Sequence, residues 1–288
     1  MKTTVRSIVR IAGTLLALFA FASASFAANP LSYPWGLALD SNGNLYVANA
    51  NANNILVFSP GYQLQTAMTI TQGISLPSGV AFDPLGHLWV ANSGSANGAV
   101  GSVTEYINGV FNPSGTITNG IFDPTAIASD GLGNIYVLND YSNVTIYDTT
   151  VAFAPSSNLL TTTTPSNPVY AIAAGQGTFS WSDGIHVIFL PATCNLQGSC
   201  TLGVMMPSSG IALASDSQGN VYSANLDRTV TWNLPIYPGV QGGRLIQLSF
   251  LPSGIAVDAS RGRIYISDAL GNAIWVYTTT GTFLRTIK

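Results

Sequence analysis

An all-β fold, a six-bladed β-propeller with four-stranded antiparallel blades, is predicted by a phrase that recurs six times along the 288-residue chain. The copies open at Pro34, Pro77, Pro124, Pro168, Pro207 and Pro252. Successive prolines lie 39 to 47 residues apart, which is the spacing of one blade per repeat. The apolar residues also alternate in short runs, as buried sheets require.

Each copy encodes two strands joined by a tight turn. In the first copy we expect an inner strand at Gly36–Leu39 and a second strand at Leu45–Ala48. Asp40 suits the turn because its carboxylate can accept hydrogen bonds from turn amides, and Gly43 can take a left-handed backbone angle without Cβ strain. We assign these residues to turn formation and give them no direct function.

A third strand follows the second in every copy, and a fourth, less regular strand completes the blade. The expected third strands are Ile55–Phe58, Val103–Tyr106, Val144–Tyr147, Ile185–Phe189, Thr229–Trp232 and Ala273–Tyr277. Expected fourth strands include Leu64–Ile70, Arg244–Phe250 and Thr282–Ile287. Because the last copy carries its own outer strand, we expect six blades of contiguous sequence, with blade 6 packed on blade 1.

Small and aromatic residues occupy separate positions in the repeat. Small residues on the inner strands, such as Gly36, Gly79 and Gly254, would let six strands crowd around a narrow axis. Aromatic side chains on the second strand should fill the space between neighbouring blades. These aromatic residues are Tyr46, Trp89, Tyr136, Tyr222 and Tyr265.

The first 27 residues have the pattern of an export signal. Three basic residues precede an apolar stretch, Ile11–Ala22, which is too short to span a bilayer comfortably. We expect cleavage after Ala27, with the run Ala22–Ala24 as a second possible site. This places a single propeller domain in residues 28–288, outside the cytoplasm, either secreted or periplasmic, and without a membrane span.

The charge of the expected mature chain is negative. Residues 28–288 contain 6 basic and 12 acidic side chains, a formal net charge of −6. Nucleic-acid binding needs a basic surface, so we exclude nucleic acid as a partner. Only 7% of the whole chain is charged, so its polar surface must come mainly from uncharged side chains.

Cys194 and Cys200 are the only cysteines. In an exported protein an even pair of cysteines favours a disulfide. The short loop that they close would contribute about 2 kcal/mol in the chain-entropy description. The alternative is a redox-active pair, although the spacing is not Cys-x-x-Cys.

The sixth copy resembles the NHL repeat. Its residues read Pro-Ser-Gly-Ile-Ala-Val-Asp from Pro252, Gly-Arg-Ile-Tyr-Ile-Ser-Asp from Gly262, and Asn-Ala-Ile-Trp-Val-Tyr up to Tyr277. The resemblance extends over nearly all of residues 34–288 and implies a propeller of NHL type. Related propellers include gluconolactonase-like hydrolases, streptogramin lyases and the lyase domain of peptide-amidating enzymes.

The catalytic sets that the resemblance implies are incomplete here. Gluconolactonase-like enzymes hold a divalent metal with a Glu near the start of the domain, whereas the only Glu of this chain is Glu105. Streptogramin lyases carry a carboxylate where this chain has Asn92, and the amidating lyases need three His, whereas only His87 and His186 exist here. We expect His87 to be a solvated turn residue and His186 to be packed or at a sheet edge.

One set of polar residues could form a site. The last residue of the second strand is Asn or Asp in every blade, and a propeller arranges equivalent positions as a ring on one face. The ring residues are Asn49, Asn92, Asn139, Asp183, Asn225 and Asp268. Either each side chain caps its own loop, or their oxygen atoms converge on weakly held Ca²⁺ or a polyhydroxylated ligand.

Two further features of the same face could contribute to binding. Blade 2 has a longer loop, Ser93–Gly101, between its second and third strands, and variable loops on a rigid scaffold often carry specificity. Tyr33 and Trp35 precede the first inner strand. They would either pack at the seam between blades 1 and 6 or offer a stacking surface.

The sequence therefore favours an exported, non-catalytic NHL-type propeller that binds an unknown protein, glycan or small molecule as a monomer. It needs no cofactor, with weak Ca²⁺ binding as an option. The alternative is a metal-dependent propeller hydrolase or lyase, which would use a metal at the axis.

Overall fold

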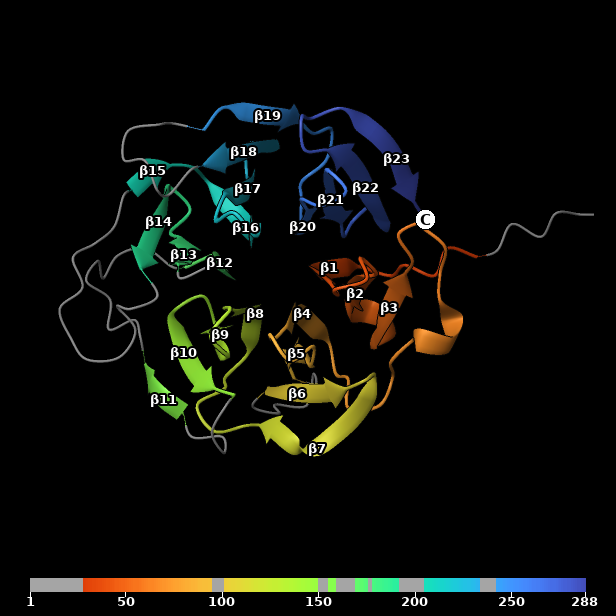
Figure 1. The fold of residues 1–288 in the computed structure, drawn as a ribbon, viewed down its shortest axis with the longest axis vertical. Coiled ribbons are helices and arrows are strands. Elements are labelled where there is room, and N and C mark those ends of the chain that lie inside the picture. Colours follow the sequence, from red (N-terminus) through yellow and green to blue (C-terminus); the bar gives the residue numbers. More distant parts are fainter. Residues whose placement is uncertain are drawn as a thin grey trace, which may run out of the picture.

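The computed structural model describes residues 28–94, 101–149, 155–158, 169–175, 178–191, 205–233 and 242–288. The expected export signal, Pro168, Cys194 and Cys200 lie outside these residues, as does most of the blade 2 insertion. In the described part, the strands form six antiparallel sheets around a central axis, as Figure 1 shows. The prediction of an all-β, six-bladed propeller is confirmed.

The strands follow one another blade by blade along the chain. Blades 1 to 3 contain β1 (Pro34–Leu39), β2 (Leu45–Asn49), β3 (Asn54–Phe58), β4 (Pro77–Phe82), β5 (Leu88–Asn92), β6 (Ser102–Ile107), β7 (Val110–Ile117), β8 (Pro124–Ser129), β9 (Asn134–Asn139), β10 (Asn143–Asp148) and β11 (Pro155–Asn158). Blades 4 to 6 contain β12 (Ala171–Gly175), β13 (Thr178–Ser182), β14 (His186–Pro191), β15 (Met205–Pro207), β16 (Gly210–Ser215), β17 (Val221–Asn225), β18 (Thr229–Asn233), β19 (Arg244–Gln247), β20 (Gly254–Asp258), β21 (Arg263–Asp268), β22 (Ala273–Thr278) and β23 (Phe283–Ile287).

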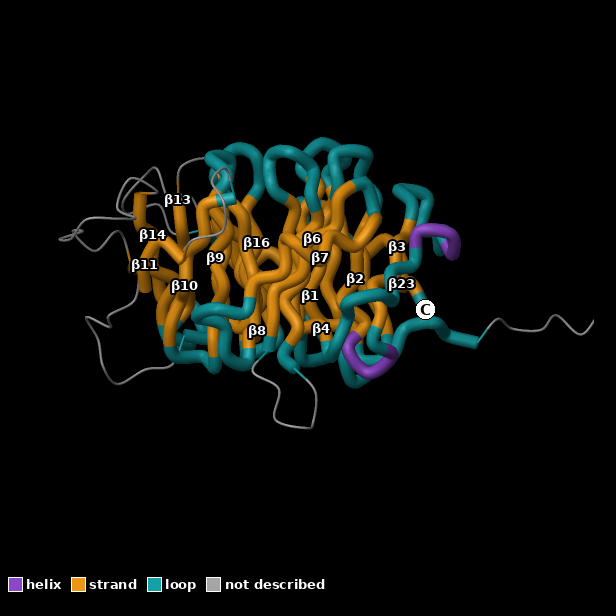
Figure 2. Tube along the Cα trace, turned by 90° about the horizontal axis from the view of Figure 1, so that it is seen from below, coloured by secondary structure: helices purple, strands orange, loops and turns teal. Residues whose placement is uncertain are grey.

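The first strand of each blade lies nearest the axis. Figure 1 shows β1, β4, β8, β12, β16 and β20 around the centre. Seen from the side in Figure 2, the strands form a thick layer with loops at both ends. A binding site at the axis would therefore open through one of these two loop-bearing faces.

Blade 1 differs from the other five because its described sheet has three strands. The expected fourth strand, Leu64–Ile70, is reduced to two isolated bridges, from Leu64 to Phe58 and from Ile70 to Ile55. Between the bridges the chain turns into the short 3₁₀ helix η2 (Thr66–Met68), which interrupts the ladder. A second such helix, η1 (Ala50–Ala52), follows β2. Neither helix, nor any other in the described part, is long and apolar enough to cross a membrane.

The turn between the first two strands forms as the sequence predicts. Asp40 Oδ1 accepts hydrogen bonds from the backbone N–H groups of Asn42 and Asn44, at 2.9 and 2.8 Å. Gly43 has a φ of 81°, in the left-handed region. The equivalent Asp130 also receives a hydrogen bond from the hydroxyl of Tyr136, at 3.0 Å. The turn aspartate therefore holds an aromatic side chain of the second strand in some blades.

Adjacent blades pack through apolar clusters to which the second-strand aromatics contribute. All five predicted aromatic residues are buried, and Trp89 is fully covered. Between blades 1 and 2, for example, Tyr46 packs with Leu88 and Tyr106. Small residues keep the inner strands close, since a Cβ at Gly36 would lie 2.7 Å from Gly79 Cα. The predicted division between small inner residues and aromatic wedges is confirmed.

The ring closes by side-by-side packing of blades 1 and 6, as predicted. The described sheet of blade 6 runs β20-β21-β22-β23, all from contiguous sequence. Hydrogen bonds cross the seam from Ser253 Oγ to the carbonyl of Pro34 (3.0 Å) and from Ser267 Oγ to the carbonyl of Trp35 (2.7 Å). The side chain of Leu31, which precedes β1, is buried in the apolar cluster at this seam.

Candidate functional site

The channel along the propeller axis holds two cavities. The larger cavity has a volume of about 340 Å³. It opens on the face that carries two kinds of loop: those that join the second strand of a blade to its third, and those that lead from one blade to the next. The smaller, of about 220 Å³, lies between the inner strands towards the other face. One aliphatic side chain from each blade lines both cavities, and we call this set the aliphatic ring. Its members are Leu37, Val80, Ile127, Ile172, Leu213 and Ile255. The aliphatic ring gives the larger cavity an apolar floor.

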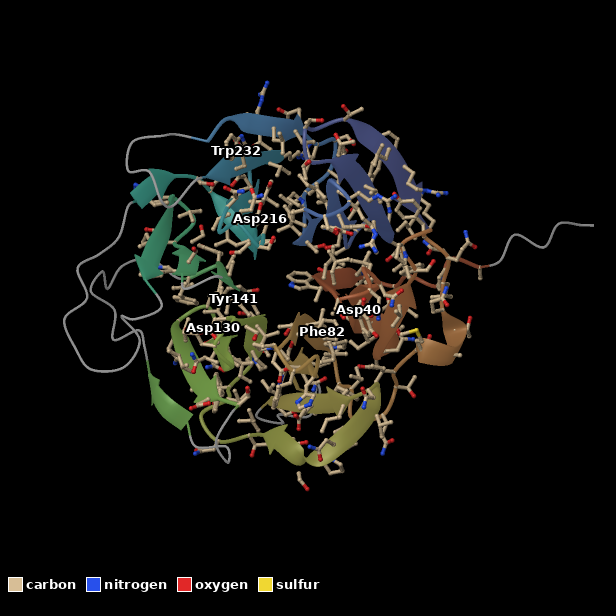
Figure 3. All side chains as sticks on the ribbon, in the orientation of Figure 1. Asp40, Phe82, Asp130, Tyr141, Asp216 and Trp232 are labelled. Carbon is tan, nitrogen blue, oxygen red and sulfur yellow. The ribbon has the colours of Figure 1, made fainter. Side chains whose placement is uncertain are left out.

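Four aromatic side chains line the larger cavity, and we call them the aromatic mouth. Tyr33 and Trp35 of blade 1 stack with ring centroids 5.4 Å apart and planes at 25°. Tyr141 and Tyr170, at the junction of blades 3 and 4, lie 6.0 Å apart with planes at 48°. Tyr141 lies beside the central opening in Figure 3. The two pairs come from opposite parts of the ring, so the ring geometry brings them to one opening.

The backbone fixes the positions of these aromatic residues. Tyr33 has a φ of 58° and Tyr141 a φ of 51°, left-handed angles that are rare for aromatic residues. The N–H of Tyr33 donates to Asn272 Oδ1 (2.7 Å), and the carbonyl of Tyr141 accepts from the N–H of Val169 (2.7 Å). Backbone strain of this kind persists where surrounding contacts impose it, and it is concentrated at functional sites.

Tyr170 rests on a glycine. A Cβ at Gly184 would lie 2.7 Å from the Tyr170 ring, and Gly184 has a φ of 81°. Any other residue at position 184 would therefore displace the ring and strain the backbone.

The hydroxyl side chains in the wall of the larger cavity donate their protons to backbone carbonyls. Ser253 Oγ donates to Pro34, Thr125 Oγ1 to Leu138 (3.4 Å) and Ser78 Oγ to Pro124. Among the described residues that line this cavity, none is Asp, Glu, His, Lys or Arg. The wall is therefore largely apolar, and its remaining polar side-chain groups are the tyrosine hydroxyls and the indole N–H of Trp35.

Tyr141 titrates above the usual range for tyrosine. Burial raises the pKa of its hydroxyl, and the negative charges of Asp123 and Asp140 and the neighbouring Tyr33 and Tyr170 raise the pKa further. The hydroxyl is therefore protonated at neutral pH. The carboxylates of Asp123 and Asp140 therefore lie close enough to Tyr141 to contribute to this shift.

The predicted Asn/Asp ring lies on the same face but behind the cavity wall. No ring residue lines the larger cavity, and all six are buried. Asn139 Oδ1 accepts from the N–H of Phe122 (3.1 Å), and its amide donates to Thr145 Oγ1 (2.8 Å). Asn92 Oδ1 likewise accepts from the N–H of Ser75 (2.9 Å). Asn139 and Asn92 thus hold the segment that leads into the first strand of their own blade, 17 residues earlier in the chain.

Asp183 and Asp268, the two carboxylates of the ring, also bind local amides. Asp183 Oδ1 accepts from the N–H groups of Ile185 (2.9 Å) and His186 (2.6 Å). Burial acts to raise the pKa of Asp183, but the hydrogen bonds from His186 and Ile185 outweigh it and lower the pKa. Asp268 Oδ1 accepts from the N–H of Gly271 (2.8 Å). Ligand binding by the ring stays a prediction.

The two histidines lie beside carboxylates. His87 Nδ1 lies 2.9 Å from Glu105 Oε1 and 3.4 Å from Asp83 Oδ2, so its side chain is paired and not simply solvated. His186 Nδ1 lies 3.5 Å from Asp183 Oδ2. In the described ranges, no group of three or more His, Cys, Asp or Glu side chains is arranged to hold a metal ion.

Sequence reasoning missed half of the aromatic mouth. For Tyr33 and Trp35 the sequence leaves open packing at the seam or a stacking surface, and in the structure both side chains line the cavity, while the backbone carbonyl of Trp35 accepts a hydrogen bond across the seam. Sequence reasoning did not single out Tyr141 or Tyr170. A usable signal was present, because a large apolar residue follows a ring position in three loops, at Tyr141, Leu226 and Leu270.

Comparison with known proteins agrees with this architecture. The family model of the NHL repeat matches residues 31–58. No match was found among curated proteins.

Solved structures with the same fold are distant in sequence. The chain is similar to a protein in a nidogen/laminin complex (13% identity over 88% of this chain and 92% of that chain, TM-score 0.60). It is also similar to the virginiamycin B lyase of Staphylococcus aureus (10% identity over 88% of this chain and 83% of that chain, TM-score 0.58). A third similar structure is a gluconolactonase of Xanthomonas campestris (12% identity over 87% of this chain and 87% of that chain, TM-score 0.62). At these identities the likeness concerns the fold. With its repeated strands and six blades the chain is a β-propeller, and its residues 31–58 match the NHL repeat.

Proposed function

We propose that this protein is an exported, non-catalytic, monomeric propeller that binds a small, largely apolar ligand in the larger axial cavity. The observation that carries the proposal is the lining of that cavity. A volume of about 340 Å³ is enough for a compact small molecule, since ligand pockets start at about 300 Å³. The aliphatic ring below and the aromatic mouth above would enclose such a ligand on its apolar surfaces.

The same lining favours an apolar ligand over a glycan. A sugar presents many hydroxyl groups, which bind well where donors and acceptors are free to meet them. Here the wall hydroxyls of Ser78, Thr125 and Ser253 already donate to carbonyls within the protein. These hydroxyls therefore have no free proton to donate to a sugar, and a sugar oxygen that needs a donor would have to displace an internal hydrogen bond, at a free-energy cost that an apolar ligand avoids.

The cavity also supports binding better than catalysis. General acid–base chemistry needs a group whose pKa lies near the working pH. The described wall offers tyrosine hydroxyls, and the raised pKa of Tyr141 keeps its hydroxyl protonated and far from a neutral working pH, so this residue suits neither the acid nor the base role. The fold neighbours include a lyase and a gluconolactonase, so a metal-dependent hydrolase or lyase remains the alternative function to test.

The proposal can be tested with the neutral apolar fluorophore N-phenyl-1-naphthylamine. Its fluorescence should rise on binding to the wild type, and Ile211→Trp, which adds volume inside the cavity, should abolish the rise. The matched control Leu132→Trp places the same ring on an exposed turn that does not line the cavity, and it should bind as the wild type does. Equal binding by the two variants would contradict the proposal. Chelator-sensitive lactone hydrolysis by the wild type would favour the enzyme.

A further inference from the structure

We propose that the ligand of the larger cavity is an organic cation, a quaternary or methylated ammonium group joined to an apolar body. This inference rests on the proposed function and adds the chemical class of the ligand. The aromatic mouth would hold the cationic group, and the cavity above the aliphatic ring would hold the apolar body.

The aromatic mouth has the composition of a cation-binding cage. It contains one Trp and three Tyr, the side chains whose faces attract cations most strongly. One of its pairs is open to solvent, since Tyr141 and Tyr170 are 37% and 36% exposed, while Tyr33 and Trp35 are half-buried. A cationic group entering the opening would therefore meet aromatic side chains from both blade 1 and the junction of blades 3 and 4.

Carboxylates strengthen the preference for positive charge. Asp123 and Asp140 are exposed next to Tyr141, and the N–H of Asp140 donates to the carbonyl of Asp123 (3.0 Å), which holds the two residues together. Both carboxylates act on the Tyr141 hydroxyl. Their charge is therefore felt at the opening of the cavity and not only at the outer surface.

Few basic residues compete with these carboxylates. No Lys or Arg occurs in residues 28–227. This range covers blades 1 to 4 and the first two strands of blade 5. All six basic residues after position 27 occur later, at Arg228, Arg244, Arg261, Arg263, Arg285 and Lys288. The side of the opening formed by blades 3 and 4 therefore has a negative potential that attracts a cation and repels an anion.

The type of cation follows from the wall of the cavity. A primary ammonium group or a metal ion needs several oxygen ligands to replace its water shell. No carboxylate lines the cavity in the described part of the chain, so a primary ammonium group or a metal ion would find no charged oxygen there. A quaternary ammonium group needs no hydrogen-bond acceptor, and its methyl groups make favourable apolar contacts. This is the chemistry that aromatic cages recognise.

Three compounds that share a benzene ring separate charge from apolarity: benzyltrimethylammonium, benzyl alcohol and benzoate. Calorimetric titration of the full chain should show the cation binding at least about tenfold more tightly than the other two, with an affinity that falls as salt is added. Trp35→Leu keeps an apolar side chain but removes the best cation-binding ring. It should therefore lower the affinity for benzyltrimethylammonium about tenfold.

Charge variants complete the test. The double variant Asp123→Asn with Asp140→Asn should lower the affinity for benzyltrimethylammonium severalfold and leave the affinity for benzyl alcohol unchanged. The control variant Asp40→Asn with Asp216→Asn removes the same charge from turns on the face opposite the aromatic mouth. It should leave the affinities for benzyltrimethylammonium and for benzyl alcohol unchanged. If benzyl alcohol or benzoate binds as tightly as the cation, and Ile211→Trp blocks that binding, the cation inference is overturned while the proposed function stands. If none of the three compounds binds, both are overturned.

Discussion

The carboxylate of Glu105, buried in β6, lies 2.9 Å from Nδ1 of His87, at the turn before β5. The second carboxylate oxygen accepts a hydrogen bond from the side-chain amide of Asn112 in β7. Glu105 thus joins the turn, the third strand and the outer strand of blade 2. The pairing also explains how a buried carboxylate is accommodated in a largely apolar blade, because both oxygens have polar partners.

We expect His87→Ala and Glu105→Gln each to destabilise the protein by about 1–3 kcal/mol, because the first leaves the buried Glu105 carboxylate with one partner fewer and the second removes the charge that His87 faces. The double variant should lose less than the sum of the two, with a coupling of about 1 kcal/mol. Chemical denaturation of the wild type, the two single variants and the double variant gives the four unfolding free energies of this double-mutant cycle. Strict additivity would show that the two side chains do not interact in solution.

Asp258 should contribute stability that is lost in acid. Burial acts to raise its pKa, but hydrogen bonds from Ser260 and Arg261 and the charge of Arg261 lower it below the usual value. A carboxyl group with a lowered folded-state pKa stabilises the protein above its unfolded pKa of about 3.9, and this contribution disappears as the pH falls through the folded-state pKa. Asp258→Asn should therefore lower Tm at neutral pH, with a difference from the wild type that shrinks towards about pH 3. A difference that grows in acid would contradict the assignment.

Gly36→Ala should destabilise the ring by roughly 1–3 kcal/mol, because its Cβ would lie 2.7 Å from Gly79 Cα and backbone cannot move away easily. Gly131→Ala is the control, since a Cβ there meets nothing within 4 Å. Thermal unfolding should show a lower Tm for the first variant and little change for the second. Similar Tm values for both would mean that the inner strands are packed less closely than described.

The Asn/Asp ring can be tested through its two carboxylates. We expect at most weak Ca²⁺ binding by the wild type, because Asp183 and Asp268 already accept hydrogen bonds from loop amides. Asp183→Asn with Asp268→Asn should keep the fold by circular dichroism and remove any Ca²⁺ binding found by calorimetry. Undiminished Ca²⁺ binding in the double variant would locate the ion elsewhere.

Cys194 and Cys200 should be bonded to each other in the exported protein. Thiol titration of the unreduced, denatured protein should find no free thiol, and Cys194→Ser with Cys200→Ser should cost about 2 kcal/mol of stability. Two free thiols in the unreduced protein would show that the cysteines are not paired.

The fold could be predicted because its signals are local. Asp40 and Gly43 specify a turn within a few residues, and the period of the repeat counts the blades. The blade 1 exception could not be foreseen, because Leu64–Ile70 has strand-like residues and yet contains the helical turn Thr66–Met68.

The candidate site was harder to predict because it depends on distant parts of the chain. Trp35 and Tyr141 belong to different repeats, and only the closed ring brings them to one opening. The pairing of His87 with Glu105 likewise depends on the register in which Trp89 lies opposite Glu105. By contrast, the contacts of Asp183 and Asp268 follow a local rule, because each carboxylate accepts hydrogen bonds from amides two or three residues later.

The seam between blades 1 and 6 has a consequence for biosynthesis. Leu37, Leu45 and Val47 of blade 1 are buried against Ile274 and Val276 of blade 6. During synthesis from the N-terminus, blade 1 exists long before its neighbour, so this apolar flank stays uncovered until the sixth blade is made. A chain cut short before blade 6 would keep the flank exposed, a feature that chaperones and proteases use to recognise incomplete proteins. Closure of the ring therefore also conceals the flank that distinguishes an unfinished chain from a finished one.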